Sequence, residues 1–193
     1  MEEQLVPGFR FYPTEEELVG YYLQHKLLNP LDDRFSRIIP VVNIYEHDPW
    51  QLPEMAGVLN CREPDQWFFF CPRQEREAQG GRPNRITPSG YWKATGSPGF
   101  VFGNNRMIGT KRTLVFYEGR APSGTKTKWK MNEFGSISQE QATTSNAQPE
   151  METQRDEFCL CRIYVNSGCM RAFDRRPLVN DFAHDAGAAA GDA

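Results

Sequence analysis

Short segments rich in aromatic and β-branched residues follow one another at hairpin spacing, and this pattern restricts the fold more than any other. Gly103-Asn104-Asn105 and residues 118–124 supply turn signals between segments. The pattern predicts an antiparallel sheet of about six or seven strands, with the aromatic run 66–71 in a central position. The expected strands are residues 38–45, 66–71, 91–96, 99–102, 106–117, 125–134 and 157–165.

The N-terminal part of the chain contains the clearest helix signal. Thr14 and Glu17 have the spacing of a capping box, in which each side chain accepts a hydrogen bond from the other residue's backbone N–H. Apolar and aromatic residues then recur at helical spacing until Asn29-Pro30. The sequence predicts a helix over residues 15–28 and a short helical turn at Asp48-Pro49-Trp50, capped by the aspartate and with the tryptophan buried. The expected class is α+β, mainly β, with a few helices flanking a twisted sheet.

The chain has the length of a single domain and changes composition in two places. Residues 138–155 are polar and lack aromatic residues, which predicts an exposed, mobile insertion. Residues 167–193 are of low complexity, which predicts a disordered tail. The expected domain therefore covers residues 1–166. No apolar run approaches the roughly 20 residues that span a membrane, and no signal-peptide pattern occurs, so we expect a soluble intracellular protein.

The cysteines and histidines do not form a recognisable ligand set. The five cysteines include no C-x-x-C pair, and the three histidines are scattered. We expect no metal site, and we interpret Cys159 and Cys161 as small apolar residues on one face of a strand, reduced in the cytosol or nucleus. The sequence also lacks a glycine-rich phosphate loop and a histidine beside a plausible nucleophile. We therefore expect no catalytic residue, cofactor or small-molecule substrate.

Positive charge is concentrated in one part of the chain. Residues 73–130 contain twelve Lys and Arg against three acids, although the whole chain has a formal net charge of −3. Within this region, the stretch 82–96 contains Arg82, Arg85 and Lys93 and no acid. Screening makes charges beyond about 10 Å nearly irrelevant. An acidic protein can therefore bind a polyanion at such a region.

Two expected strands in the basic region carry cations in an alternating pattern. Every second residue from Lys126 to Lys130 is a lysine, so these lysines share one face. A solvated edge that resists aggregation is the alternative explanation for this face. In the other strand, Trp92 and Lys93 lie on opposite faces. Alternation alone leaves open which of these two faces points outward.

A strand is narrow enough to enter the major groove of DNA, which is about 12 Å wide. The small residues 94–96 let the backbone approach the base pairs, while Lys93 reaches a base or a phosphate. Arg82 and Arg85, in an expected loop over residues 74–88, then lie where the phosphates pass. We expect phosphate contacts from the loop arginines and the lysine strand, and base contacts from the WKATG strand.

Several ordered motifs carry a family resemblance. They are LVPGFRFYPTEEELVGYYL, IYEHDPWQLP, WFFFCPRQ, GRPNR followed by SGYWKATG, IGTKRTLVFYEGRAPSGTKTKWKMNEF, and DEFCLCRIYV. With these motifs, the chain resembles a plant NAC-domain transcription factor over roughly residues 5–165. The resemblance implies a twisted antiparallel sheet between helical elements, without enzyme activity or metal. It also implies a nuclear protein that binds double-stranded DNA as a dimer at sites with a CGT-type core.

The resemblance further implies roles for single residues. Composition leaves open whether the N-terminal arm packs on its own domain or pairs with another chain. The resemblance favours pairing with a second copy, with Arg10 and Glu17 forming salt bridges across the dimer. The implied dimerisation residues are Leu5, Gly8, Phe9, Arg10, Pro13 and Glu17, and the implied DNA-binding residues are Arg76, Arg82, Arg85, Trp92, Lys93, Ala94, Thr95, Gly96, Lys126 and Lys128.

The chain departs from the family pattern in two places. After WKATG the family usually continues Thr-Asp-Lys, whereas this chain has Ser97-Pro98-Gly99, so affinity or flanking-base preference is expected to change. Only about 28 residues follow Val165, whereas relatives usually carry a long regulatory region there. An alternative function follows: a dimerising interaction module that binds DNA weakly and modulates related NAC proteins as a heterodimer partner.

Overall fold

The structure of the chain, a computed structural model, describes residues 11–58, 65–78, 80–137 and 157–166. Within these ranges no helix is long and apolar enough to cross a membrane. Three regions with sequence predictions lie outside the described residues: the N-terminal arm up to Arg10, the insertion over 138–155 and the tail over 167–193.

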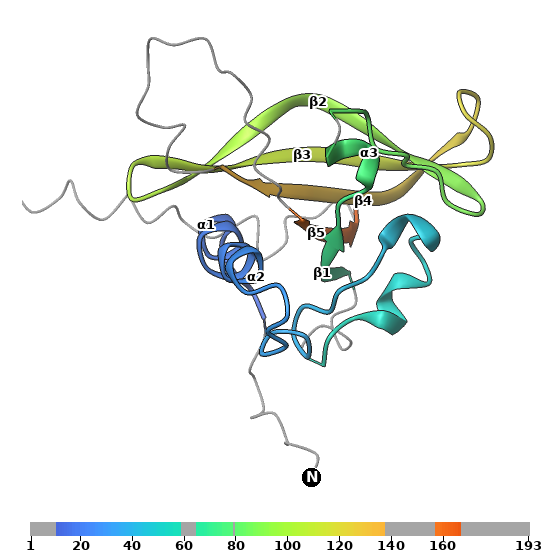
Figure 1. The fold of residues 1–193 in the computed structure, drawn as a ribbon. Helices are drawn as coiled ribbons and strands as arrows, with labels where there is room; N and C mark the ends of the chain where they lie inside the picture. The colour runs from blue at the N-terminus through green and yellow to red at the C-terminus, as the bar shows by residue number, and fades with distance from the viewer. Residues whose placement is uncertain (1–10, 59–64, 79, 138–156, 167–193) are drawn as a thin grey trace, which may run out of the picture.

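The main element is one five-stranded antiparallel sheet with short helical segments around it (Figure 1). The mainly β class predicted from the sequence is confirmed. The strands are β1 (Gln66–Pro72), β2 (Gly90–Gly103), β3 (Arg106–Glu118), β4 (Thr125–Ser136) and β5 (Phe158–Val165), and the helical segments are α1 (Glu15–Glu17), η1 (Leu18–Leu23), α2 (Gln24–Leu28), η2 (Ile44–Glu46), η3 (Leu52–Met55) and α3 (Glu75–Ala78). Their order in the sheet is β1-β5-β4-β3-β2.

The described sheet has fewer strands than the predicted six or seven, for two reasons. The expected strands 91–96 and 99–102 are one strand, β2, with a register shift between Thr95 and Gly99. The expected strand 38–45 makes only an isolated parallel bridge between Val41 and Phe70, and then turns into η2. Pro40 contributes to this difference, because proline has no backbone N–H to extend a ladder.

The aromatic strand β1 lies at an edge of the sheet, so its predicted central position is wrong. Its burial is nevertheless complete from Gln66 to Cys71. Residues 40–42 cover its free edge, since the Phe70 N–H donates to Pro40 O at 2.9 Å and the Val42 N–H donates to Phe70 O at 2.9 Å. An irregular segment therefore takes the place of a neighbouring strand. This explains why β1 is as buried as a central strand although it lies at an edge of the sheet.

The predicted N-terminal helix is confirmed as the continuous run α1, η1 and α2. Its capping box is present: the Glu17 N–H donates to Thr14 Oγ1 at 3.1 Å, and the Thr14 N–H donates to Glu17 Oε2 at 2.6 Å. The middle segment η1 is π-helical rather than α-helical, which the sequence did not indicate. Leu18, Val19 and Leu23 of this segment are buried, so this is the part that packs on the sheet.

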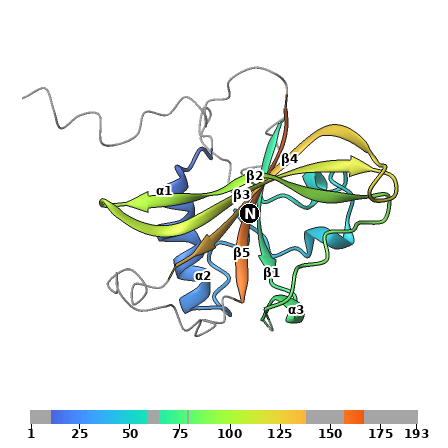
Figure 2. The ribbon, with the colours of Figure 1, turned by 90° about the horizontal axis from the view of Figure 1, so that it is seen from above.

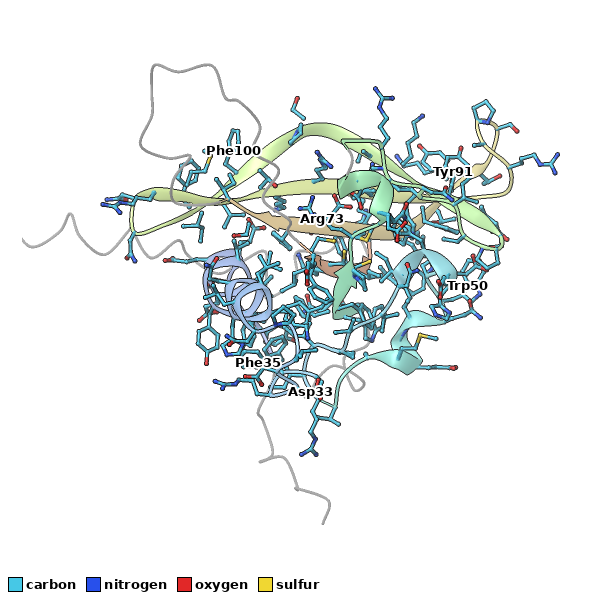
Figure 3. All side chains as sticks on the ribbon, viewed as in Figure 1. Asp33, Phe35, Trp50, Arg73, Tyr91 and Phe100 are labelled. Atoms are coloured by element: carbon cyan, nitrogen blue, oxygen red, sulfur yellow. The ribbon has the colours of Figure 1, made fainter. Side chains whose placement is uncertain are left out.

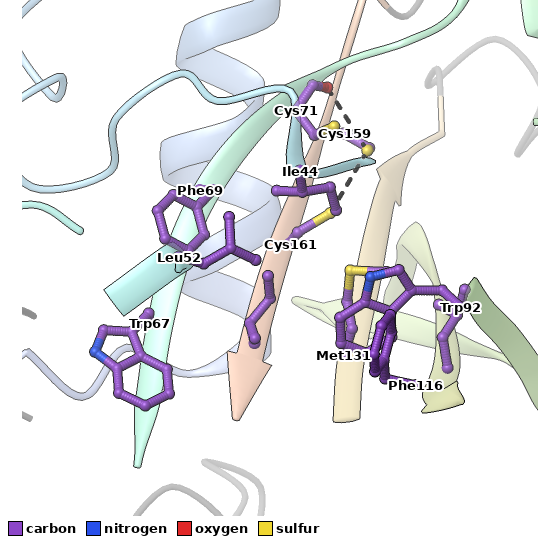
Figure 4. Packing of buried hydrophobic residues seen from close by; sticks show 12 residues of the cluster. Ile44, Leu52, Trp67, Phe69, Cys71, Trp92, Phe116, Met131, Cys159 and Cys161 are labelled. Atoms are coloured by element: carbon purple, nitrogen blue, oxygen red, sulfur yellow. Dashed lines mark hydrogen bonds between the residues drawn. The ribbon is translucent and has the colours of Figure 1, made fainter. Parts of the chain in front are cut away.

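Both faces of β1 and β5 are covered. The N-terminal helix lies on one side and residues 41–58 lie on the other (Figures 1 and 2). Because side chains alternate along β1, Phe68 and Phe70 belong to the helix-side core, whereas Trp67 and Phe69 belong to the opposite core shown in Figure 4. The strands β2, β3 and β4 extend beyond these two covers (Figure 1).

Val19 of the N-terminal helix lies close to the backbone of the sheet at Gly109 of β3. A Cβ at this position would lie 2.4 Å from Gly135 O and 2.7 Å from Val19 Cγ1, both shorter than real Cβ contacts. Glycine at position 109 therefore allows the helix to contact the backbone of the sheet. Any side chain there would push the two apart.

We predict that Gly109→Ala lowers the free energy of unfolding by about 1–3 kcal/mol, because overpacking strains a closely packed interior. Urea denaturation measures this change. Gly99→Ala is the matched control, since a Cβ at Gly99 would lie 4.0 Å from its nearest neighbour, Lys111 O. Equal losses for the two variants would show that the close contact at Gly109 does not limit the packing.

Candidate nucleic-acid interface

The loop before β2 is closed by hydrogen bonds between two of its own residues, and Asp48 attaches it to the rest of the molecule near its end. Near its start, the Gln74 side chain donates to Asn84 O at 2.7 Å and accepts from the Asn84 N–H at 2.8 Å. Near its end, Asp48 Oδ1 accepts hydrogen bonds from Thr87 Oγ1 at 2.6 Å and from the Ser89 N–H at 3.1 Å. The loop is therefore held in a defined position beside β2.

Asp48 has a different role from the predicted one. Its side chain is 7% exposed and binds the loop, whereas the helical turn that follows it, η3, begins only at Leu52. Trp50 was predicted to be buried, but it is 44% exposed and lies at the outside of the molecule (Figure 3). The Asp-Pro-Trp pattern fits a cap, and only the folded chain brings Thr87 and Ser89 to the carboxylate.

Arg85 is held by the carboxylate of Glu133, whose side chain is 12% exposed. Its Nη2 lies 3.4 Å from Glu133 Oε2, and Arg112 Nη1 lies 3.5 Å from Glu133 Oε1. The Tyr45 hydroxyl also donates to Glu133, at 3.3 Å. Burial raises the pKa of Tyr45 above its ordinary value, so this phenol remains protonated as a donor. Arg85 is only 18% exposed, and its guanidinium ties the loop to the sheet.

Desolvation by itself lowers the pKa of Arg85, but Glu133 and Tyr45 raise it overall. The guanidinium is therefore charged throughout the physiological pH range. Arg82, three residues earlier in the loop, is exposed. Arg76 lies on α3, and its side chain is outside the described part. Of the loop cations predicted to contact phosphate, Arg82 is the described side chain that solvent reaches freely.

The structure decides which face of the WKATG segment points outward. Trp92 is 2% exposed and packs in the core against Phe116, with ring centroids 5.3 Å apart. Residues 93–96 are exposed. Trp92 therefore positions the strand from the inside and presents no side chain to a ligand. Because β2 is the last strand of the sheet, the segment after Trp92 lies at a free edge in the described part of the chain.

The departure from the family pattern lies within a bulge of β2. Thr95 pairs with Thr113 and Gly99 pairs with Lys111, so three residues of β2 face a single intervening residue of β3. All three residues, Gly96, Ser97 and Pro98, are exposed. Gly96 has φ +71°, a conformation that glycine adopts without steric cost. The bulge thus pushes residues 96–98 out of the sheet beside the exposed WKATG segment.

Two tyrosines connect the cations of β2 and β4. Tyr91 stacks on Tyr117 with ring centroids 5.5 Å apart, and Lys93 Nζ lies 5.6 Å from the centroid of the Tyr117 ring. Tyr117 is the register partner of Lys126. Lys126 and Lys128 are exposed on β4. The structure therefore brings Lys93 and the lysine strand onto one surface.

Lys130 belongs to the same surface, although it was not among the predicted site residues. It pairs with Val115, which in turn pairs with Lys93, and register partners in a sheet point to the same side. The alternate spacing of Lys126, Lys128 and Lys130 in the sequence was sufficient to predict that Lys130 lies on this surface. Tyr91 and Tyr117 had no comparable signal, because their stacking depends on the pairing of β2 with β3.

The predicted dimerisation residues fall in two groups. Pro13 is buried, and Glu17 is exposed at the start of the N-terminal helix. Glu17 has a local role in the capping box, and it also lines a pocket of about 470 Å³ with Phe11, Tyr12, Pro13, Tyr21 and Tyr22. The remaining predicted residues, Leu5, Gly8, Phe9 and Arg10, lie outside the described part.

The fold is a mainly β domain whose edge strand β2 carries the exposed Lys93. Trp92 fixes this strand in the core, and the loop held by Asp48 lies beside it. Sequence comparisons assign this domain. The family model described as "No apical meristem (NAM) protein" matches residues 6–136. The chain therefore belongs to the NAC (No apical meristem) family, a plant transcription factor family.

Relatives within the family match most of the chain. NAC domain-containing protein 22 of Oryza sativa subsp. japonica is 44% identical over 177 residues, which cover 90% of this chain and 52% of that protein. NAC transcription factor 29 of Arabidopsis thaliana is 40% identical over 178 residues, which cover 91% of this chain and 62% of that protein. The chain thus spans about half to three-fifths of the length of these relatives.

We predict that Asp48→Ala lowers the free energy of unfolding by about 1–3 kcal/mol, because it leaves the Thr87 hydroxyl and the Ser89 N–H without their acceptor. Chemical denaturation measures this loss, and faster amide hydrogen exchange at Ser89 reports release of the loop. Asp33→Ala is the control, since Asp33 is exposed (Figure 3) and is expected to change stability by less than about 0.5 kcal/mol. Unchanged exchange at Ser89 would contradict the anchoring role.

Proposed function

We propose that this chain is a sequence-specific, double-stranded DNA-binding regulator of transcription, without enzymatic activity, that acts in the nucleus as a dimer. The observation that carries the proposal is the exposed segment 93–96 at the free edge of the sheet, beside the lysines of β4. An edge strand offers a narrow ridge with small side chains, and such a ridge fits the major groove. Membership in a transcription factor family supports the same conclusion.

The contacts divide by side-chain position. Lys93, Ala94, Thr95 and Gly96 are proposed to meet the base edges of sites with a CGT-type core. Lys126 and Lys128, together with Arg76 and Arg82, are proposed to meet phosphates, which position the protein without reading sequence. Arg85 and Trp92 contribute by holding the loop and the strand in place, because Arg85 is ion-paired and Trp92 is buried.

The dimer is proposed to form through the N-terminal arm, with Arg10 of each copy paired to Glu17 of the other. The exposed position of Glu17 beside the aromatic pocket supports this arrangement, because a cation can approach both a carboxylate and aromatic rings there. Heterodimers with other NAC proteins are proposed to use the same pairing.

A second candidate function is a dimerising module that binds DNA weakly. The observation that favours it is the exposed bulge, where Ser97 and Pro98 stand in place of the usual Thr and Asp and the cation expected at Gly99 is missing. Electrophoretic shift over a salt series separates the two functions. A steep loss of affinity as salt rises indicates several phosphate contacts and favours the first function. Dimerisation with weak, non-selective binding favours the second.

We predict that Lys93→Ala weakens binding to a selected duplex by about 1–3 kcal/mol, as expected for a side chain that reads a base edge. Binding to a random duplex is expected to weaken less. Fluorescence anisotropy at fixed salt measures both affinities. Arg106→Ala is the matched control, because Arg106 is an exposed cation at the far end of β3. Equal losses on the two duplexes would show that Lys93 contacts only phosphate.

We predict that Glu17→Gln weakens the dimer about fivefold to thirtyfold, since the symmetric dimer loses two exposed ion pairs that contribute about 0.5–1 kcal/mol each. Glutamine retains the acceptor of the capping box, so the helix is expected to keep its stability. Sedimentation equilibrium measures the dimer constant, and Glu16→Gln is the control for lost charge. Arg10→Gln is expected to weaken the dimer by the same factor, and combining it with Glu17→Gln is expected to weaken the dimer no further. An unchanged dimer constant in Glu17→Gln would refute the assigned pair.

A further inference from the structure

A cluster of three cysteines lies in the core on the side of the sheet covered by residues 41–58 (Figure 4). Cys71 of β1 and Cys159 and Cys161 of β5 are all buried and free. Cys159 Sγ lies 3.8 Å from Cys161 Sγ, and the Cys159 thiol donates to Cys71 O at 3.7 Å. The sequence explained Cys159 and Cys161 as small apolar residues, but it gave no reason for a third thiol beside them.

The strand register favours one particular covalent bond in this cluster. Cys71 and Cys159 are direct partners in the antiparallel pair of β1 and β5. Direct partners have Cα atoms about 4.5–5.5 Å apart, within the 4.4–6.8 Å range of disulfides. Cys159 and Cys161 are two residues apart on one strand, so their Cα atoms are about 6.6–6.8 Å apart. The cross-strand pair therefore has the better backbone geometry.

Hydrogen bonds distribute the ionisation of the three thiols unequally. The hydrogen bond from Cys159, and then that from Cys161, lowers the pKa of Cys71 well below its ordinary value. The hydrogen bond with Cys159 raises the pKa of Cys161 above its ordinary value. Cys71 is therefore the sulfur on which a negative charge is favoured. The thiolate is the reactive form of cysteine toward electrophiles.

The cluster lies at the end of its strand pair, which gives a reagent a route to the sulfurs. Cys71 is the last residue of β1 but one, and Cys159 is the second residue of β5. Pro72 follows Cys71 and has no N–H for the ladder. The next hydrogen bond is from the Arg73 N–H to Glu157 O, at 2.8 Å. Opening at this end exposes Cys71 without unfolding the sheet.

We propose that Cys71 and Cys159 are an oxidation site that reacts with hydrogen peroxide to form a reversible disulfide between β1 and β5. The Cys71 thiolate attacks one peroxide oxygen, the O–O bond breaks, and the leaving hydroxide takes a proton to become water. The Cys159 sulfur then attacks the sulfur of the Cys71 sulfenic acid as the Cys159 thiol loses its proton, and the displaced hydroxide takes that proton and leaves as the second water. Two thiols lose two electrons in total, and one peroxide becomes two waters.

Contacts connect the disulfide to the loop that contains Arg85. The expected effect of oxidation on DNA binding therefore rests on the proposed function. Tyr45 packs against the core cluster that contains all three cysteines, and its hydroxyl donates to Glu133. Glu133 is the register partner of Cys161 and the ion-pair partner of Arg85. Drawing two sulfurs together under Tyr45 shifts the residues that hold Arg85. The oxidised protein is therefore expected to bind duplex DNA several-fold more weakly.

The test uses the full chain with Cys61→Ser and Cys169→Ser, which leaves the three clustered thiols. The protein is treated with equimolar hydrogen peroxide, its remaining thiols are blocked, and it is digested with trypsin without reduction. The expected product is a cross-link between peptide 63–73, which contains Cys71, and peptide 156–162, which contains Cys159 and Cys161. The cross-link is expected to disappear with dithiothreitol and in Cys159→Val, and to persist in Cys161→Val.

Two results would overturn the oxidation site. The first is a disulfide confined to peptide 156–162, and the second is a cross-link that forms only in denaturant. Near-ultraviolet circular dichroism establishes that each variant is folded.

DNA binding is measured separately, before and after oxidation, with Cys159→Val as the variant whose affinity oxidation is not expected to change. A cross-link without a change in affinity would leave the site in place and refute its connection to the loop. Failure of the reduced protein to bind DNA would instead refute the proposed function.

Discussion

The burial of β1 and β5 on both faces is the constraint on which the rest of the structure depends. Aromatic side chains alternate along β1, so each face presents apolar surface that must be covered. The N-terminal helix covers one face, and residues 41–58 cover the other. The chain therefore uses parts of residues 11–58 as two covers for strands that follow later. The far parts of β2, β3 and β4 remain outside these covers and carry the exposed cations.

The candidate interface is built by polar groups buried behind it. Asp48, from one of the two covers, fixes the end of the loop through Thr87 and Ser89. Glu133, from the middle of the sheet, binds Arg85 and Arg112 and accepts from Tyr45. These carboxylates are largely removed from solvent, where their interactions are stronger than at the surface. The described part of the loop is thus held in position before a ligand binds, which lowers the entropic cost of binding.

The site could be predicted from the sequence where charge and alternation were sufficient. Lys126 and Lys128 are exposed on β4, as the alternating pattern predicts, and Lys93 lies on the same surface. Arg85 and Trp92 differ from this pattern, because one is ion-paired and the other is in the core. Neither the ion pair of Arg85 nor the burial of Trp92 can be predicted from the neighbouring residues in the sequence. The partner of Arg85 is 48 residues away, and the burial of Trp92 depends on Phe116 of the neighbouring strand.

The sequence by itself determined the elements whose signals are local: the capped helix, the turns, the runs of β3, β4 and β5, and the family to which the chain belongs. Only the tertiary structure decided the order of the strands, the edge position of β1, the union of two expected strands into β2, and the meeting of Cys71 with Cys159. The physical reason is that strand pairing joins residues far apart in the chain. Side-chain alternation fixes which residues share a face, but it does not fix which strand lies beside it.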